Sequence, residues 1–362
     1  MQTFEREFAA WLGVPDAIAT GFGRAALRLG FEAAQCKGKS VLVPSFICAQ
    51  VVDAVRAAGA TVACYPVQRD LTIRTADFVN ALHPGVRAAI VPHYFGRATA
   101  NIAELAAACR ERSVLLIEDC ALACGASLHG KLAGTFGDLA IFSCTKSDWC
   151  YGGGVLASRS SELATRARAL RAESFRAAPS LLFSYGVLRR ADFLANRPRW
   201  SAAAERGGRL LERLARIKEA NFYDAGRCDA LMSSRSARRA CRLLRSLADD
   251  IRCRHELKRQ LLHQLCGCPH VLFWLDEHPG DTRAFLLLRS PAGRAREWVA
   301  AAGRDGVTLR LSWPAYQDLP ERKSDAVEWL ADHLAILEVH PKLTGKELQR
   351  MADCVRRLAA RE

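Results

Sequence analysis

One lysine, Lys146, follows a short apolar stretch and precedes three consecutive glycines at positions 152–154. A second apolar stretch, residues 114–117, runs directly into the acid pair Glu118 and Asp119. An acid at the end of one strand and a lysine shortly after another can hold a pyridinium cofactor from two sides. The two segments together suggest pyridoxal phosphate chemistry.

The segments around these residues alternate between short apolar runs and amphipathic stretches of about ten residues, which predicts a largely parallel sheet covered by helices on both faces. Ligands of such sheets collect at the carboxyl ends of the strands. Asp119, His93 and Ser143 each lie within two residues of a predicted strand end, so we expect them to face one crevice. Asn101 is placed to cap one of the helices. We predict strands at 41–44, 61–65, 88–91, 114–117, 139–142 and 155–157, and helices at 47–58, 76–82 and 102–112.

The second half of the chain has a different pattern, mostly helical and then mixed. It predicts a smaller α/β domain appended to the large one. We place the large domain at residues 1–225, including an amino-terminal helix and a helical insert at about 174–225, and the small domain at 226–362. Long helices are expected at 163–173, 202–220 and 235–266, strands at 284–288 and 307–311, and further helices at 292–302, 323–337 and 345–361.

Composition is that of a soluble globular protein, with 362 residues, of which half are hydrophobic and a quarter charged. The amphipathic, acid-bearing start is neither a signal peptide nor a transit peptide, and no apolar run approaches the roughly 18 residues of a membrane span. We therefore expect a cytoplasmic protein without a transmembrane segment. The 14 cysteines are scattered, which favours reduced thiols, and no spacing typical of a metal site is present, so no metal is expected.

The net charge of +14 raises the question of an anionic partner. A dense basic zone at 235–259 has helical periodicity, which is typical of a solvated helix face, although a phosphate-rich small substrate would also suit it. No zinc finger, basic zipper or RNA-binding aromatic signature is present, so nucleic acid is not expected. The insert at about 174–225 has two interpretations. Its helices pack on a dimer or cover the site, or it forms a basic, apolar patch for peripheral membrane contact or a partner enzyme.

A series of short motifs resembles the DegT/DnrJ/EryC1/StrS family of pyridoxal phosphate-dependent sugar aminotransferases, of the aspartate aminotransferase fold. Each motif is weak evidence by itself, but their order and spacing together are strong evidence for the fold. The resemblance covers nearly the whole chain. The motifs are Gly23-Arg-Ala-Ala-Leu27, Val43-Pro-Ser-Phe46, Val91-Pro-His-Tyr-Phe-Gly96, Ile117-Glu-Asp-Cys-Ala121, Gly137-Asp138, Phe142-Ser143, Lys146, Gly153-Gly154 and Asp305-Gly-Val-Thr-Leu-Arg310.

The resemblance implies a fold type I enzyme with two catalytic residues. Lys146 would form the Schiff base with the cofactor aldehyde and then shuttle the proton. Asp119 would pair with the pyridine nitrogen and keep it protonated, and Ala121 would lie against one face of the ring. Histidine replaces the lysine in the family's dehydratase branch, so Lys146 argues against that branch.

The resemblance also implies a phosphate site. The turn at Gly23, Arg24 and Ala25 opens a helix, whose first amides bind anions, and the guanidinium of Arg24 adds a charged contact. Ser143 would supply a hydroxyl. Cys48 stands where relatives usually stack an aromatic on the cofactor ring.

Two further departures accompany Cys48. Leu122 replaces a glutamine that bonds the cofactor in many relatives, and Ser143 and Lys146 are closer in sequence than is usual. These departures fit a divergent branch of the family and leave the substrate open.

The resemblance therefore predicts a homodimeric aminotransferase. It would move an amino group, from glutamate as the expected donor, to a nucleotide-linked keto sugar in polysaccharide or secondary-metabolite biosynthesis. Two alternatives stay open. One is a pyridoxal phosphate enzyme with another outcome, such as elimination or side-chain cleavage of an amino acid. The other is a non-catalytic relative that serves as a scaffold.

Overall fold

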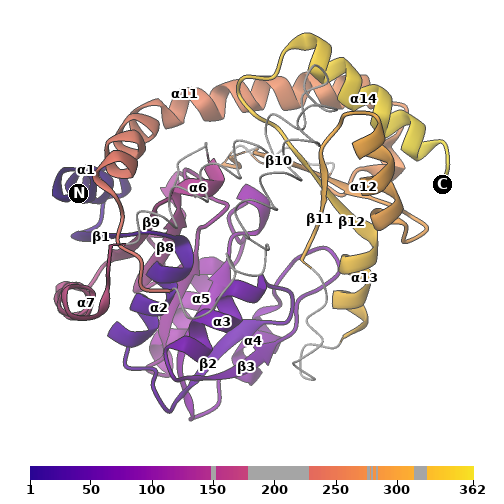
Figure 1. The fold of residues 1–362 in the computed structure, drawn as a ribbon. Helices are drawn as coiled ribbons and strands as arrows, with labels where there is room; N and C mark the ends of the chain where they lie inside the picture. Colours follow the sequence, from indigo (N-terminus) through magenta and orange to yellow (C-terminus); the bar gives the residue numbers. More distant parts are fainter. Residues whose placement is uncertain (148–151, 178–227, 275–277, 279, 283, 314–323) are drawn as a thin grey trace, which may run out of the picture.

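The computed structural model describes residues 1–147, 152–177, 228–274, 278, 280–282, 284–313 and 324–362. These residues build a large and a small sheet with helices around them, together with one short two-stranded hairpin (Figure 1). Most of the predicted insert at 174–225, its proposed surface patch and the helix expected at 202–220 lie outside the described residues. No helix of the described part has the length and apolarity needed to cross a membrane.

The large sheet has seven strands in the order β1-β9-β8-β5-β4-β2-β3. The five strands from β3 to β8 are parallel, while β9 runs antiparallel to both β8 and β1. The six predicted strands are confirmed, and β1 is an additional one that the sequence pattern did not reveal. The strands are β1 (Asp16–Thr20), β2 (Ser40–Pro44), β3 (Thr61–Tyr65), β4 (Val86–Pro92), β5 (Leu115–Asp119), β8 (Leu139–Ser143) and β9 (Gly154–Ser158).

Helices cover both faces of the large sheet because its apolar side chains alternate between the two faces. On β5, for example, Leu116 packs into the core with α1, α4 and α5, whereas Ile117 packs into the core with α2, α3 and α7. The helices of this part are α1 (Gln2–Leu12), α2 (Gly23–Ala33), α3 (Ala49–Ala57), α4 (Thr75–Ala81), α5 (Ile102–Glu111) and α7 (Ser161–Ser174). Short elements complete it: η1 (Tyr94–Gly96), the hairpin β6 (Ser127–Leu128) and β7 (Lys131–Leu132), and α6 (Cys144–Ser147).

The prediction that the Asn101 side chain caps α5 is wrong. Asn101 occupies the N-cap position, but its side chain makes no capping hydrogen bond. Its amide instead donates to the carbonyl of Ile73 (2.8 Å) and to Thr75 Oγ1 (2.9 Å). The residue therefore ties α5 to the start of α4.

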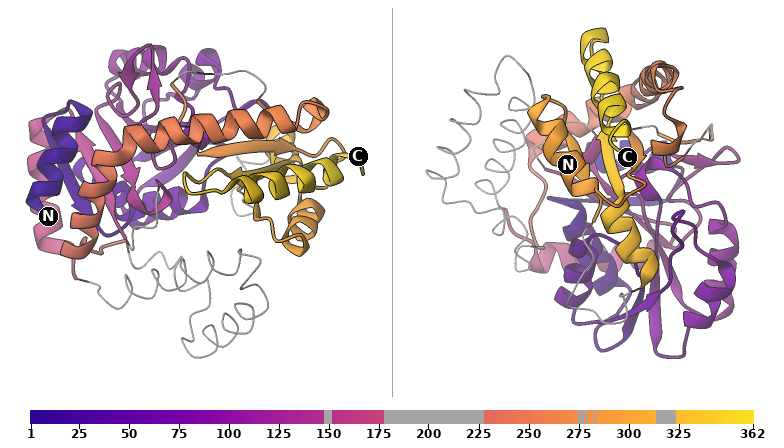
Figure 2. Two further views of the ribbon diagram at one scale, coloured as in Figure 1. Left: turned by 90° about the horizontal axis from the view of Figure 1, so that it is seen from above. Right: turned by 90° about the vertical axis from the view of Figure 1, so that its right-hand side faces the viewer.

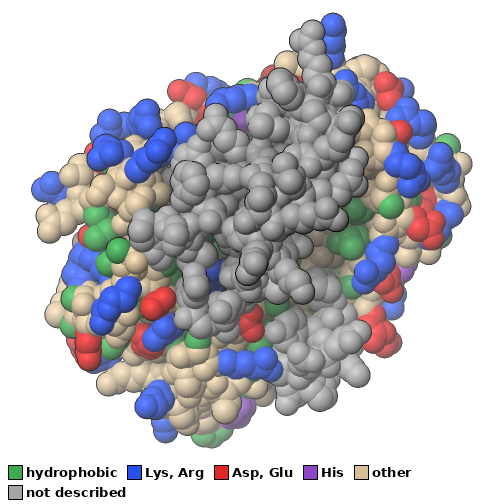
Figure 3. Space-filling view, viewed as in Figure 1, with side chains coloured by type: hydrophobic (Ala, Val, Ile, Leu, Met, Phe, Trp, Pro, Cys, Tyr) green, Lys and Arg blue, Asp and Glu red, His purple; other side chains and the backbone are tan. Residues whose placement is uncertain are grey.

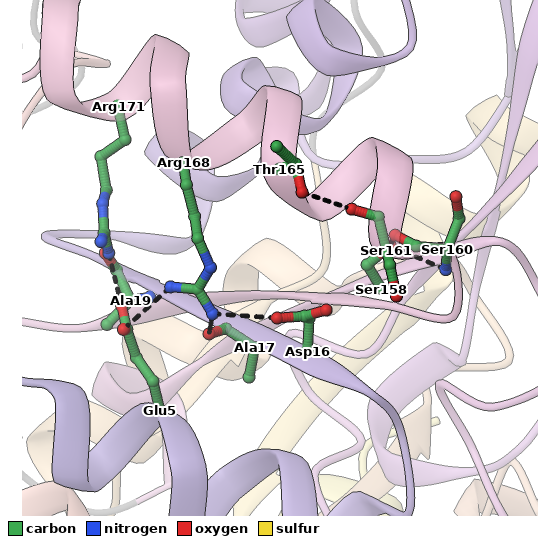
Figure 4. Close-up of polar contacts among 10 residues, drawn as sticks. All are labelled: Glu5, Asp16, Ala17, Ala19, Ser158, Ser160, Ser161, Thr165, Arg168 and Arg171. Atoms are coloured by element: carbon green, nitrogen blue, oxygen red, sulfur yellow. Dashed lines mark hydrogen bonds and ion pairs between the residues drawn. The ribbon is translucent and has the colours of Figure 1, made fainter.

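The edge strand β1 is held by an ion network beneath α7 (Figure 4). The buried carboxylate of Glu5 accepts the N–H of Ala19 (2.8 Å) and bonds to Arg168 (3.2 Å) and Arg171. Arg168 also bonds to Asp16 (3.1 Å). Burial opposes ionisation of Glu5, but the Ala19 amide and the two guanidinium groups hold its pKa below the usual range.

The small sheet has three antiparallel strands in the order β10-β12-β11. The long helix α11 (Ser234–Gln264) runs from α1 to α14 (Figure 2), and exposed arginines gather on the side of the molecule where it lies (Figure 3). The strands are β10 (Phe285–Arg289), β11 (Leu309–Leu311) and β12 (Leu334–Glu338), and the remaining helices are η3 (Pro269–Val271), α12 (Ala295–Arg304), α13 (Asp325–His333) and α14 (Gly345–Ala359).

The prediction of one helix over 323–337 is wrong. Helix α13 ends at His333, and the following residues form β12, the central strand of the small sheet. A strand whose two faces are both covered carries a nearly continuous apolar run, here Leu334 to Leu337. Such a run cannot be distinguished from a buried helical segment by its periodicity.

Candidate active site

A cavity of about 280 Å³ lies where the carboxyl end of the large sheet meets the small sheet. Asp119, His93 and Ser143 all line it, which confirms that these strand ends face one crevice. The predicted cofactor residues that line it are Gly23, Arg24, Cys48, Asp119, Ala121, Ser143 and Lys146.

Ala25 is the one predicted cofactor residue that does not line the cavity. Its side chain is fully buried in the core between α2 and the sheet, and its N–H donates to the carbonyl of Phe22 (3.1 Å). The third residue of the predicted turn is therefore already inside the helix, with its amide used by the first helical turn.

Asp119 ends β5 and reaches the cavity from its floor. Its Oδ1 accepts the N–H of Ala121 (3.0 Å), which fixes the carboxylate in a tight local turn. Burial raises the pKa of Asp119, although Lys146, the Ala121 amide and His93 each act in the opposite direction. The carboxylate thus sits in a site that favours a nearby cation.

Glu118 precedes Asp119 but its side chain serves the scaffold. Its two oxygens accept the N–H groups of Gly134 (2.8 Å), Phe136 (2.7 Å) and Gly137 (2.7 Å). His93 Nε2 lies 2.8 Å from the same carboxylate. Burial opposes ionisation of Glu118, yet these donors hold its pKa below the usual range.

The tautomer of His93 follows from the hydrogen bond at its other ring nitrogen, Nδ1. The amide of Thr99 donates to His93 Nδ1 (3.0 Å), so Nδ1 is unprotonated and Nε2 carries the hydrogen that Glu118 accepts. His93, Glu118 and Cys120 have potential metal-ligating atoms within 4.8 Å of one another. Because the carboxylate oxygens and both imidazole nitrogens already make hydrogen bonds, we interpret this group as a hydrogen-bonded support for the end of β5.

The start of α2 forms the opposite side of the cavity. Phe22 is its N-cap residue, and a phenylalanine side chain cannot cap the helix because it has no acceptor. A Cβ on Gly23 would lie 3.3 Å from Ser143 Cβ, and one on Gly154 would lie 2.2 Å from the Phe22 carbonyl oxygen. Gly154 therefore lets the helix start approach β9 more closely than any larger residue would, and a side chain on Gly23 would be tightly packed against β8.

The polar groups at this helix start suit an anion. Phe22, Gly23 and Arg24, at the N-terminus of α2, line the cavity, so the positive end of the helix dipole lies beside it. Ser143, whose Oγ lies 2.9 Å from Thr145 Oγ1, stands beside Gly23. The guanidinium of Arg24 lies over the Phe22 ring, 4.8 Å from its centroid.

Lys146 lies in α6, directly after β8, and its partly buried side chain also lines the cavity. Cys48, at the N-cap of α3, and Leu122 form other parts of the wall. The cavity therefore combines an amine, a carboxylate and a helix start whose groups suit an anion, which come from three different strand or helix ends.

Sequence reasoning missed the wall that the small sheet contributes. It consists of Phe285, Arg310, Leu311, Trp313, Ile336 and Glu338, together with Phe95 from η1. The available signal was Arg310, a charged residue between two leucines in a predicted strand. Glu338 joins this wall because it ends β12, a strand that the sequence pattern does not distinguish from a helix.

The chain is similar to known proteins in sequence and in fold. Residues 1–184 match the model of the DegT/DnrJ/EryC1/StrS aminotransferase family. A dTDP-4-dehydro-2,3,6-trideoxy-D-glucose 4-aminotransferase of Saccharopolyspora spinosa is 37% identical over 175 residues, which are 47% of this chain and 45% of that protein. A GDP-perosamine synthase of Vibrio cholerae is 34% identical over 142 residues, which are 39% of this chain and 38% of that protein. The chain thus spans less than half the length of these curated relatives.

The likeness to solved structures extends further along the chain. The crystal structure of the aminotransferase TlmJ from Streptoalloteichus hindustanus has 22% sequence identity and a TM-score of 0.74, with 99% of this chain and 90% of that one covered. At this identity the likeness concerns the fold. It confirms the predicted fold class, in which a mostly parallel sheet between helices is joined to a smaller α/β part.

Proposed function

Because the chain belongs to the DegT/DnrJ/EryC1/StrS aminotransferase family, we propose that it is a pyridoxal phosphate-dependent aminotransferase. The amino donor is glutamate and the acceptor is a keto sugar carried on a nucleotide. The relatives' names support this acceptor class, since they include dTDP-linked and GDP-linked sugar enzymes. The active form is a homodimer in the cytoplasm.

The observation that carries the proposal is the meeting of Lys146, Asp119 and the start of α2 in one cavity. The donor set fits pyridoxal phosphate. Asp119 would hold the ring nitrogen, the α2 start with Arg24 and Ser143 would hold the phosphate, and Lys146 would meet the aldehyde. When bound, pyridoxal phosphate supplies an electron sink for the substrate carbon that loses a proton.

The protein's own groups then have defined tasks. The Asp119 carboxylate, whose burial makes an unpaired charge costly, stabilises a proton on a ring nitrogen. The Lys146 amine would take the proton from the donor's α-carbon and deliver it to the cofactor carbon that had carried the aldehyde. Cys48 and Ala121, which line the cavity, would confine the ring between α3 and the end of β5.

The test is a spectrum of the purified protein with added pyridoxal phosphate. We expect a visible chromophore, bleached by glutamate, that borohydride fixes onto Lys146 as shown by peptide mass spectrometry. Lys146→Ala should lose turnover entirely. Lys131→Ala removes an exposed lysine that lies over the Phe136 ring (4.3 Å), and it should behave as wild type.

Other outcomes would separate the alternatives. A protein that ignores the cofactor would support the scaffold. A chromophore that forms without transfer of the glutamate amino group would instead support elimination or side-chain cleavage. Label on another lysine would overturn the assignment of Lys146.

A further inference from the structure

The small sheet presents two chemically different faces. Leu286, Leu309 and Leu337 point outward into the core beneath α12 and α14. The opposite face carries Phe285 directly across from Glu338, and Arg310 directly across from Ile336. All four of these side chains line the cavity. A charged pair beside apolar and aromatic side chains on the cavity-facing side is the kind of exception that indicates a functional surface.

An aromatic cluster continues this face. Trp313 follows β11 by two residues, and its ring stacks on Phe95 with centroids 5.4 Å apart and planes at 24°. Phe46 (5.2 Å) and Tyr94 (5.9 Å) support Trp313 from the large-sheet side. The rings of Phe95, Phe285 and Trp313 line the cavity, so they form an aromatic surface inside it.

The backbone holds this surface in an unusual conformation. Phe95 has φ 50° and ψ 32°, in the left-handed region that non-glycine residues rarely adopt. Such a conformation is costly and persists where the surroundings enforce it. Ser312 fixes the other side, because its Oγ donates to the Leu330 carbonyl (3.1 Å). The two stacked rings are thus positioned from both sheets before any ligand binds.

Polar groups stand at the edge of the aromatic surface. Arg310 Nη2 and Glu338 Oε2 are 4.0 Å apart, and both side chains are partly exposed. A guanidinium only donates hydrogen bonds and a carboxylate only accepts them. Hydroxyl groups can satisfy both, so an edge of this kind suits a polyhydroxylated ring.

We propose that the cavity-facing side of the small sheet is the subsite for the sugar ring of the amino acceptor. The inference rests on the proposed function and deepens it. The C–H face of a six-membered sugar packs on Trp313 and Phe285, while its ring hydroxyls bond to Arg310 and Glu338. A nucleobase also stacks on aromatic rings, and the experiment below separates these two parts of a nucleotide sugar.

The experiment measures the two half-reactions separately. The donor half-reaction is followed as glutamate bleaches the chromophore, and the acceptor half-reaction as a dTDP-linked 4-keto sugar restores it. Trp313→Leu should lower kcat/KM of the acceptor half-reaction about fivefold, which corresponds to about 1 kcal/mol, a typical contribution of an aromatic contact beyond its buried area. The donor half-reaction should stay within about twofold of wild type.

Three controls keep the result interpretable. Trp313→Phe retains a ring and should recover most of the acceptor rate. Trp329→Leu makes the same change on α13, where Trp329 stacks on His333 (4.4 Å) and does not line the cavity. It should lower the unfolding temperature without changing the acceptor rate. Free dTDP should bind to wild type and Trp313→Leu with the same Kd.

Several results would overturn the inference. An equal loss in both half-reactions would make Trp313 a structural residue, and a weaker Kd for dTDP would assign the wall to the nucleobase. An unchanged acceptor rate in Trp313→Leu would refute the subsite alone. A wild-type protein without a chromophore would refute the proposed function and the inference together.

Discussion

The large and small sheets meet at one cavity but contribute to it in different ways. The large sheet supplies Asp119, Ser143 and Lys146 from the ends of parallel strands and from the residues just beyond them. The small sheet supplies Phe285, Arg310 and Glu338 from a strand face, along with Trp313 from the loop that follows. Strand ends converge because of the parallel topology itself, whereas groups on a strand face converge only when the register is right.

This difference suggests a division of labour. Reactive groups occupy positions that the topology fixes, and we expect recognition groups on the surface that is free to vary. It follows that damage to a strand end should affect chemistry for every substrate. Damage to the small-sheet face should affect one substrate, as proposed for Trp313.

The largest effect is expected at the end of β5. Asp119→Asn removes the charge that we propose holds the ring nitrogen protonated, and kcat/KM should fall about 10²–10⁴-fold for every acceptor. The cofactor-free protein should become more stable, because burial raises the pKa of Asp119 and the ionised form is therefore disfavoured in the folded state. We expect a gain of about 0.5–1 kcal/mol at neutral pH in urea unfolding, typical of substitutions that relieve a strained site.

The pH dependence gives the sign of this effect. The penalty from ionised Asp119 is fully present above its folded pKa and disappears as the pH falls through that value toward the unfolded value of about 3.8, so the stabilities of the two proteins should converge in acid. Asp138→Asn is a matched control, since Asp138 accepts the Leu116 amide (2.8 Å) and does not line the cavity. An Asp119→Asn protein that is both inactive and less stable would contradict the predicted strain.

The next effect concerns the neighbouring carboxylate on the same strand. Glu118→Gln replaces two acceptor oxygens with one oxygen and one NH₂ group, which would face N–H donors. The free energy of unfolding should fall by about 3 kcal/mol, because buried donors lose their partner. Urea unfolding at neutral pH measures the loss, and the chromophore should still form in the folded fraction.

Acid should remove the stability advantage of the wild type over Glu118→Gln. The pKa of Glu118 is lowered in the folded state, so its contribution is present above the unfolded value of about 4.5 and is lost as pH falls through the folded value. The difference in free energy of unfolding between wild type and Glu118→Gln should narrow over the same pH range. If Zn²⁺ raised the unfolding temperature of wild type but not of the variant, His93, Glu118 and Cys120 would be a metal site after all.

The sequence predicts the strand ends of the large sheet better than the cavity-facing side of the small sheet. The ends of β5 and β8 could be predicted, because an apolar run before a polar residue marks a strand end regardless of register. The end of β12 could not, since its apolar run is the same for a buried helix and a central strand. The contacts of Phe46 and Phe95 with the Trp313 ring join residues more than 200 positions apart in the chain, and no local pattern encodes them.

The side chain of Asn101 shows a related limit. The residue type predicted a helix start, and α5 does begin there, but a partner 28 residues away took the amide. The left-handed Phe95 shows it too, because nothing in that residue type favours a positive φ. Tertiary contacts decided both, so the sequence indicated the element but not what its side chain does.

The smallest expected effect tests whether the two faces of the small sheet are independent. Helix α14 covers the outer face, with Leu348 and Val355 packed in the same core as Leu337. Its capping box joins the Thr344 N–H to Glu347 Oε2 (2.8 Å) and the Glu347 N–H to Thr344 Oγ1 (3.3 Å). Thr344→Ala should lower the free energy of unfolding by about 1 kcal/mol, the usual contribution of an N-cap.

The informative readout of Thr344→Ala is the acceptor half-reaction, which should not change. Lys346→Ala, an exposed change in the same turn, controls for surface charge and should leave stability within about 0.5 kcal/mol of wild type. If the acceptor kcat/KM fell along with stability, the outer core would be setting the position of Arg310 and Glu338 on the inner face. The small sheet would then be one coupled unit, and a face that cannot change without its core would not be free to vary with substrate.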